Sequence, residues 1–203
     1  MSNAYWIPED FHQVEEIIKN SRFITQVYPV KSADQAKDII KTVKAEYPDA
    51  RHHCSAFIAS SPADFNQVGF SDDGEPSGTA GKPMLAVLQG AGIGQILVIS
   101  IRYFGGVKLG TGGLVKAYAG GVKLALSNLK TRWMIPKNYY QLVCEYGQWD
   151  QIQYWLAQLD GDIVETQYSD KVELLLALTE ANSDNLQTKL NDMQLTLKRI
   201  KQK

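Results

Sequence analysis

Cysteine and histidine are scarce in this sequence, and long apolar runs are missing. The 203 residues include 2 cysteines, Cys54 and Cys144, and 3 histidines. Neither cysteine has a neighbour at metal-ligand spacing, so we expect no metal and no cofactor, and lone thiols are typical of a reducing cytoplasm. No segment is apolar for long enough to cross a membrane, and the first residues do not read as an export signal. We therefore expect a cytoplasmic protein without a membrane partner.

Acidic residues are absent between Pro76 and Cys144, although the whole chain is nearly neutral, with 22 acidic and 21 basic residues. A chain with a balanced total charge can still carry a basic face that binds polyanions. The alternative is that these cations point in several directions and only aid solubility. The basic residues of this segment are Lys82, Arg102, Lys108, Lys116, Lys123, Lys130, Arg132 and Lys137.

The stretch from Ile96 to Leu129 predicts a buried strand, a glycine-rich loop and a helix. An apolar, β-branched run ends at Arg102, and residues with helical spacing follow from Leu114. The N–H groups at the start of a helix favour an anion, whereas the alternative role of the glycines is a sharp turn with tight packing. The glycines in question are Gly105, Gly106, Gly110, Gly112 and Gly113.

Two further clusters precede this stretch. Arg51, His52, His53 and Cys54 lead into a strand predicted for Ser55–Ala59; neighbouring strand residues face opposite ways, so we favour a structural or phosphate-contacting role over a metal site. The loop Gly69–Gly81 then carries three carboxylates, those of Asp72, Asp73 and Glu75. They have the chemistry to hold Mg²⁺ or to act as a general base, or they cap the next helix and pair with lysines; Thr79 is a second candidate cap for that helix.

The remaining pattern predicts an α+β protein of two domains. The N-terminal part has extended pieces within Phe11–Val30, a turn at Lys19–Ser21 and a helix at Ala33–Glu46 capped by Ser32. Thr131–Asn138 has the composition of a linker. Beyond it, strands at 139–145, 162–168, 171–178 and 195–200 alternate with helices at 149–159 and 183–193, which gives the βαββαβ order of a ferredoxin-like domain. We place the domains at residues 1–132 and 137–203.

Four blocks of this sequence resemble the IMPACT family, most closely its bacterial branch. They are SRFI at Ser21–Ile24, DARHHCSAF at Asp49–Phe57, GFSDDGEPSGTAGKPML at Gly69–Leu85 and IRYFGGVKLGTGGLVKAYAGG at Ile101–Gly121. The resemblance implies an N-terminal βαβ domain like ribosomal proteins and domain IV of elongation factor G, and a C-terminal domain like domain V of that factor. It also implies a link to translation. Eukaryotic relatives carry an additional N-terminal module and act on translation initiation through a stress-kinase pathway. We see no such module in this sequence and do not expect that role here, and the family offers no settled catalytic residues.

Three functions remain open, and the residues favour binding over catalysis. The first is binding of RNA or a ribosomal surface, in which Tyr103 and Phe104 would stack on bases. The second is a phosphate- or nucleotide-handling enzyme that uses Asp72–Glu75, with Lys82 or Lys108 holding phosphate. The third is a protein-docking adaptor that uses the C-terminal sheet. For the first function the phosphate contacts would come from Arg51, His53, Lys82, Arg102, Gly105, Gly106, Lys108, Gly110, Gly112, Gly113, Lys116 and Lys123.

Overall fold

Strand β6 (Ile96–Tyr103) is the centre of the N-terminal unit in the computed structural model, which describes residues 4–200. Its residues from Ile96 to Arg102 are all buried, and successive side chains point to opposite faces of the sheet. Leu97, Ile99 and Ile101 pack into one core, while Ile96 and Val98 pack into the other. An uninterrupted apolar run therefore suits this position, because both faces of β6 are covered.

Five strands form the sheet in the order β2-β3-β6-β4-β5, and all neighbours are antiparallel. The two-residue turn at Lys19 and Asn20 has positive φ at both positions, as a tight hairpin requires. Strands β3 and β4 run in the same direction with β6 between them. The strand bounds are β2 His12–Ile18, β3 Ser21–Pro29, β4 His52–Ile58 and β5 Val68–Ser71, with a short 3-10 turn at Phe65–Gln67.

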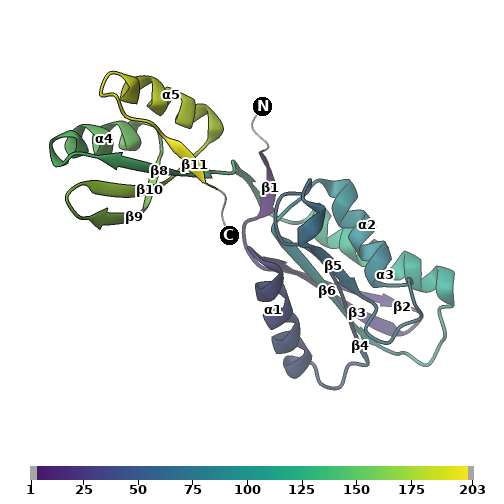
Figure 1. Cartoon of the computed structure of the whole chain (residues 1–203). Helices are drawn as coiled ribbons and strands as arrows, with labels where there is room; N and C mark the ends of the chain where they lie inside the picture. The colour runs from purple at the N-terminus through teal and green to yellow at the C-terminus, as the bar shows by residue number, and fades with distance from the viewer. Residues whose placement is uncertain (1–3, 201–203) are drawn as a thin grey trace. The chain divides into compact units, whose positions relative to one another are not determined.

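Helices cover both faces of this sheet (Figure 1). Helix α1 (Ala33–Glu46) lies on one face, and α2 (Gly81–Ala91) and α3 (Thr111–Ser127) lie on the other. The Ser32 side chain caps α1 by accepting from the Gln35 N–H, as predicted. Strands β5 and β6 run parallel to each other, since both are antiparallel to β4. Both strands therefore end on the same side of the sheet, the side formed by strand ends and not by an outermost strand. Helices α2 and α3 begin on that side, which we call the edge.

The segment predicted to be a linker is a strand in its first half. Thr131–Met134 forms β7, which pairs antiparallel with β1 (Tyr5–Pro8). The Trp6 and Trp133 rings meet edge to face with centroids 4.8 Å apart. The partner strand lies far away in the sequence, so local composition could not reveal this pairing. The chain divides between Met134 and Ile135.

The C-terminal unit has the predicted βαββαβ order, and its sheet has the strand order β11-β8-β10-β9 with antiparallel neighbours throughout. Helices α4 and α5 each begin three residues before the predicted start, because Glu145 and Thr179 cap them there. The last strand is shorter than predicted, because the Gln187 side chain binds the backbone of Leu195 and Leu197 instead. The elements are β8 Asn138–Cys144, α4 Tyr146–Gln158, β9 Asp162–Tyr168, β10 Val172–Leu178, α5 Glu180–Asn191 and β11 Lys198–Ile200.

These two units make the protein a mixed α+β chain of two domains, as predicted. Within residues 4–200, none of the helices has the length and apolar character needed to cross a membrane.

Candidate functional site

Asp72 caps helix α2 with its side chain. Its carboxylate accepts hydrogen bonds from the backbone N–H groups of Gly78 (2.7 Å), Ala80 (3.0 Å) and Gly81 (2.8 Å). Partial burial by itself raises the pKa of Asp72, but these three donors outweigh it and the pKa is lowered. Thr79, the other predicted cap, instead donates its hydroxyl to the Pro76 carbonyl at 2.6 Å. Asp72 is thus the structural cap of α2, and the prediction for Thr79 was wrong.

Asp73 joins the same turn to helix α1 and strand β4. Its carboxylate forms an ion pair with Lys44 of α1 and accepts from the His53 N–H at 2.6 Å. Burial opposes ionisation, yet these partners lower the pKa of Asp73. The His52 Nδ1 atom lies 2.9 Å from the Asp73 carbonyl oxygen. Residues 72–75, which we call the acidic turn, are therefore fixed to the end of the sheet.

Glu75 completes the acidic turn by entering the protein interior. It is 8% exposed, and one carboxylate oxygen accepts from Arg102 Nη1 at 2.6 Å and from the Tyr118 hydroxyl at 2.7 Å. Arg102 is 5% exposed and lies over the rings of Phe23 and Phe104. Glu75 and Arg102, which we call the buried pair, connect the acidic turn to strand β6. Helix α3 joins them because Tyr118 donates to the same buried oxygen atom of Glu75.

The three carboxylates are thus held by different partners. Of the two alternatives that the sequence left open, a site for Mg²⁺ or a general base and a helix cap with ion pairs, the structure shows the second. No group of three His, Cys, Asp or Glu residues within the described part of the chain is placed to hold a metal ion. Cys54 does not offer a nucleophile, because burial raises the pKa of its thiol to about 12 and the thiol donates to the Asp72 carbonyl.

The glycine loop, residues 104–110, lies against the turn between β2 and β3. A Cβ atom on Gly105 would stand 2.0 Å from the backbone of Asn20, so only glycine fits there. The Ser21 hydroxyl accepts from the Gly105 N–H at 3.2 Å and from Arg102 Nη2 at 3.4 Å. This serine joins the loop to the buried pair.

Helix α3 begins at the end of this loop without a side-chain cap. Gly110 occupies the N-cap position at φ 73°, a conformation that favours glycine. Thr111 and Gly112 are exposed at the first turn. The N–H groups of that turn, with the helix dipole behind them, form an end that favours an anion.

Four exposed lysines are positioned by the elements that start at this edge. Lys108 belongs to the glycine loop, Lys82 to the first turn of α2, and Lys116 and Lys123 to one face of α3. None of the four forms a salt bridge with a residue between positions 4 and 200. We call Lys82, Lys108, Lys116 and Lys123 the basic edge.

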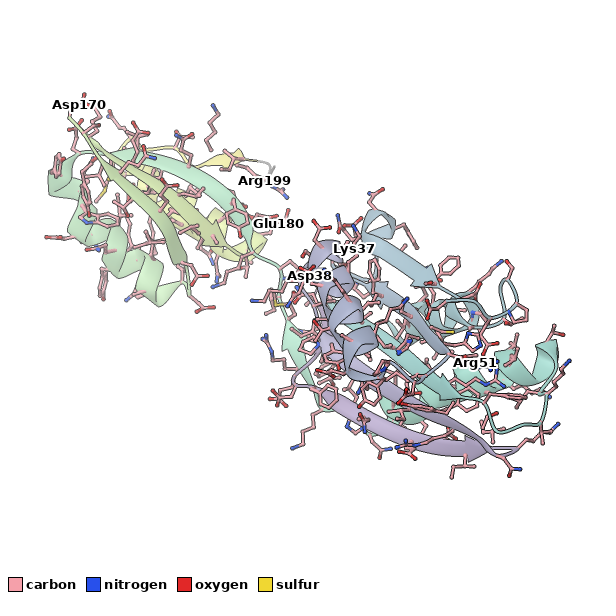
Figure 2. The ribbon with its side chains drawn as sticks, turned by 90° about the horizontal axis from the view of Figure 1, so that it is seen from below. Lys37, Asp38, Arg51, Asp170, Glu180 and Arg199 are labelled. Atoms are coloured by element: carbon pink, nitrogen blue, oxygen red, sulfur yellow. The ribbon has the colours of Figure 1, made fainter. Side chains whose placement is uncertain are left out.

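Three other predicted phosphate contacts, Arg51, His53 and Arg102, and the basic residue Lys137 of the acid-free segment lie elsewhere. Arg102 and His53 are buried, with Arg102 paired to Glu75 and His53 Nε2 lying 3.1 Å from the Tyr47 carbonyl oxygen, so neither side chain reaches the surface. Arg51, labelled in Figure 2, directly precedes β4 and is exposed. Lys137 belongs to the C-terminal unit and pairs with Asp160 and Asp162. The acid-free segment therefore supplies fewer free cations to one surface than its sequence implies.

Two residues of this network were missed from the sequence as functional positions. The sequence predicts a turn at Lys19–Ser21 and a helix from Leu114 that includes Tyr118, and neither position by itself indicates a function. Each is buried and joined by hydrogen bonds to Arg102 or Glu75. Their presence in the SRFI and VKAYAGG blocks was the only available signal.

Known families match both units of the chain. Residues 19–126 match the model of the Impact N-terminal domain, and residues 142–193 match a domain of unknown function, DUF1949. The chain belongs to the IMPACT family. The IMPACT family member YigZ of Escherichia coli is 49% identical, covering 93% of each chain. A family member from Haemophilus influenzae is 39% identical and covers 93% of this chain and 91% of its own.

A solved crystal structure of a hypothetical protein also resembles this IMPACT chain over its full length. The two share 47% identity, with a TM-score of 0.83 and complete coverage of both chains. The resemblance seen in the sequence blocks is therefore confirmed. Those blocks contain the acidic turn, the glycine loop and the buried pair.

Loss of the Glu75 carboxylate is expected to destabilise the protein strongly. The variant Glu75→Ala leaves Arg102 charged and buried without its partner, which lowers the free energy of unfolding by about 3–5 kcal/mol. Urea denaturation measures this loss. The control Glu9→Ala, at an exposed carboxylate, changes stability by less than about 0.5 kcal/mol. Equal losses in the two variants would contradict a buried, paired role for Glu75.

Acid is expected to weaken the fold through the acidic turn. The pKa of Asp72 is lowered in the folded state. Its contribution to the free energy of unfolding is therefore complete above the ordinary aspartate pKa of about 3.9, and it is lost as the pH falls through the lowered pKa of the folded state. Urea stability measured against pH should fall less steeply below about pH 4 in Asp72→Asn than in the wild type. Asp10→Asn, at an exposed position, should keep the wild-type dependence. Identical curves for all three proteins would contradict this role.

Proposed function

We propose that this IMPACT family member is a translation-linked cytoplasmic protein that binds the phosphate groups of RNA, free or in the ribosome, through its basic edge. The observation that carries this proposal is the exposure of Lys82 and Lys108 where α2 and α3 begin, with Lys116 and Lys123 continuing along one face of α3. Phosphate contacts from lysines and backbone N–H groups position a nucleic acid without reading its sequence. The proposal is therefore one of affinity for phosphate.

The nearby carboxylates do not cancel the positive charge of the basic edge. Asp72 is occupied by three backbone N–H groups, Asp73 by Lys44 and the His53 N–H, and Glu75 by Arg102. The charges of Asp73 and Glu75 are thus paired with cations inside the N-terminal unit, whereas Asp72 keeps its charge and is stabilised by backbone dipoles. The four lysines outnumber this one carboxylate of the acidic turn, so they attract a polyanion over roughly 10 Å at moderate salt.

The glycine loop adds two features to the lysines. The uncapped start of α3 presents N–H groups close in sequence to Lys108, and such groups bind phosphate oxygens well. Phe104 is 46% exposed and offers a face on which a base can stack. Tyr103 is a poorer candidate, since it is half-buried and packs beside the core under α1.

Removal of two lysines from the basic edge is expected to weaken the salt dependence of RNA binding. Lys108→Ala combined with Lys116→Ala deletes two phosphate contacts, and the slope of log affinity against log salt should fall by about 1.4 for a single-stranded RNA. Fluorescence anisotropy with a labelled RNA oligonucleotide measures this slope at several salt concentrations. Sedimentation with ribosomes should show a matching loss for the same variant.

The matched control removes two exposed lysines from the opposite side of the sheet. Lys31 directly precedes the cap of α1, and Lys41 lies within α1, so Lys31→Ala with Lys41→Ala makes the same change in net charge. This control should keep the wild-type slope. Equal slopes for both double variants, or RNA binding that does not respond to salt, would rule out the basic edge as the binding surface.

A further inference from the structure

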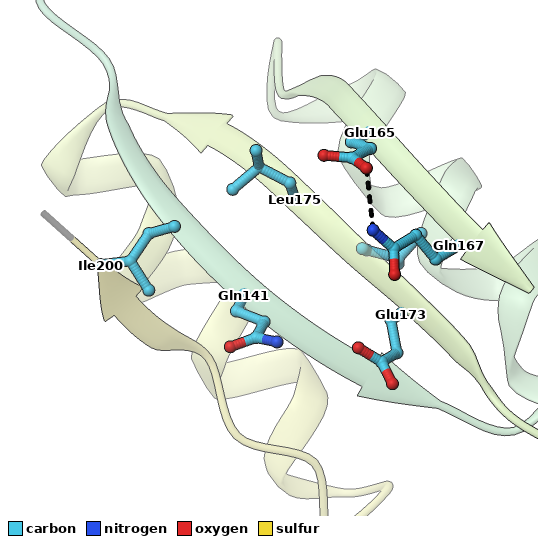
Figure 3. A pocket seen from close by; sticks show the side chains of 7 residues that line it. Gln141, Glu165, Gln167, Glu173, Leu175 and Ile200 are labelled. Carbon is cyan, nitrogen blue, oxygen red and sulfur yellow. Dashed lines mark hydrogen bonds between the residues drawn. The ribbon is translucent and has the colours of Figure 1, made fainter. Parts of the chain in front are cut away.

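One face of the C-terminal sheet is left uncovered. Helices α4 and α5 pack against the other face, where Leu142, Leu174 and Leu176 form the core. The intervening residues of the strands point away from both helices, as Figure 3 shows for Gln141, Glu173 and Leu175. This open face is a surface that neither helix of the unit covers.

The open face contains a shallow hollow of about 310 Å³. Two rows of side chains cross it: Leu175 lies opposite Gln141 and Glu165, and Glu173 lies opposite Val143 and Gln167. Because Glu165 and Glu173 occupy diagonal positions on neighbouring strands, their backbones are separated by about 7–8 Å. The floor of the hollow is therefore apolar at Leu175, with a carboxylate on each row (Figure 3).

These two carboxylates have no cationic partner in the described part of the chain. The ion pairs of this unit join Lys137 to Asp160 and Asp162, and Lys171 to Glu145. Glu165 accepts only from the neutral amide of Gln167, at 2.8 Å. Lys198 faces the same side of the sheet but stands three strands from Glu165, roughly 14 Å away. The whole segment from Ile135 to Lys203 has ten acidic and seven basic residues.

We propose that this open face binds a segment of another protein that carries lysine or arginine side chains. A cation placed over the hollow reaches both Glu165 and Glu173, and like charges so close together are stabilised by a counter-charge. Its aliphatic stem covers Leu175, as long cationic side chains do on apolar surfaces, and a neighbouring apolar side chain of the segment packs on Ile200. The amides of Gln141 and Gln167 provide donors and acceptors for the peptide backbone.

The same observations disfavour a nucleic acid in this hollow, which does not include Tyr139 of the same face. Carboxylates repel phosphate, and a four-stranded sheet that binds single-stranded RNA uses aromatic side chains to stack the bases. The side chains that line this hollow, all within residues 141–200, are acidic, amide or aliphatic. The inference is thus independent of RNA binding by the basic edge, which lies in the other unit.

Binding of a short labelled peptide in which arginine alternates with valine tests this inference on the full chain. Fluorescence anisotropy should show binding that weakens about tenfold when Glu165→Gln and Glu173→Gln are combined, since two exposed charge pairs are lost. The methyl NMR resonances of Leu175 and Ile200 should shift when the peptide is added to the wild type. A peptide with glutamate in place of arginine should not bind.

The matched control moves the charge change to the helical side of the same unit. Asp150→Asn with Asp184→Asn, at exposed positions of α4 and α5, should bind the arginine peptide as the wild type does. An equal loss in this control would show attraction by net charge alone and would overturn the inference. Failure of the arginine peptide to bind the wild type would also overturn the inference. Loss of RNA binding in the Glu165→Gln, Glu173→Gln variant would overturn it, because the occupant would then be RNA. Loss of self-association of the chain in that variant would overturn it too, because the occupant would then be a second copy.

Discussion

The N-terminal domain depends on one buried ion pair, between Glu75 and Arg102. Through it the acidic turn, the central strand β6 and helix α3 share a single carboxylate oxygen, and Ser21 extends the connection to the glycine loop. Burying two charges is costly, and a pair of apolar residues of similar size would hold a fold as well. We therefore interpret the Glu75–Arg102 pair as a contact that fixes the positions of the acidic turn and the glycine loop. Both loops flank the edge at which α2 and α3 begin.

Fixing those loops also decides the electrostatics of that edge. The residues that look most reactive in the sequence, the carboxylates of the acidic turn with Cys54 and Arg102, are occupied by one another or by backbone groups. The four lysines of the basic edge, in contrast, are exposed and form no salt bridge with a described residue. Exposed charges of opposite sign lie in different domains, because the open face of the C-terminal sheet carries the carboxylates of Glu165 and Glu173. One chain of nearly neutral charge thus carries four exposed lysines without a salt bridge in one domain and two carboxylates without a cationic partner in the other, among the residues that the structure describes.

Local patterns were sufficient to predict most of the elements. Helix α1 was predicted to its terminal residues, because Ser32 and Gln35 mark its start and Pro48 follows its end. The βαββαβ order of the C-terminal domain followed from the alternation of short apolar strands with amphipathic helices. The errors occurred where a distant partner decides the structure. Thr131–Met134 is a strand only because Tyr5–Pro8 pairs with it, and β11 is short because Gln187 takes the backbone groups before it.

The sequence by itself determined the two α+β domains, the family blocks and the concentration of basic residues between Pro76 and Cys144. Only the tertiary structure decided which of those charges face solvent. Arg102 and Lys108 are six residues apart and read alike as cations, yet one is buried against Glu75 and the other is exposed on the glycine loop. Whether a charge is neutralised depends on partners brought near by folding, and no spacing along the chain encodes that distance.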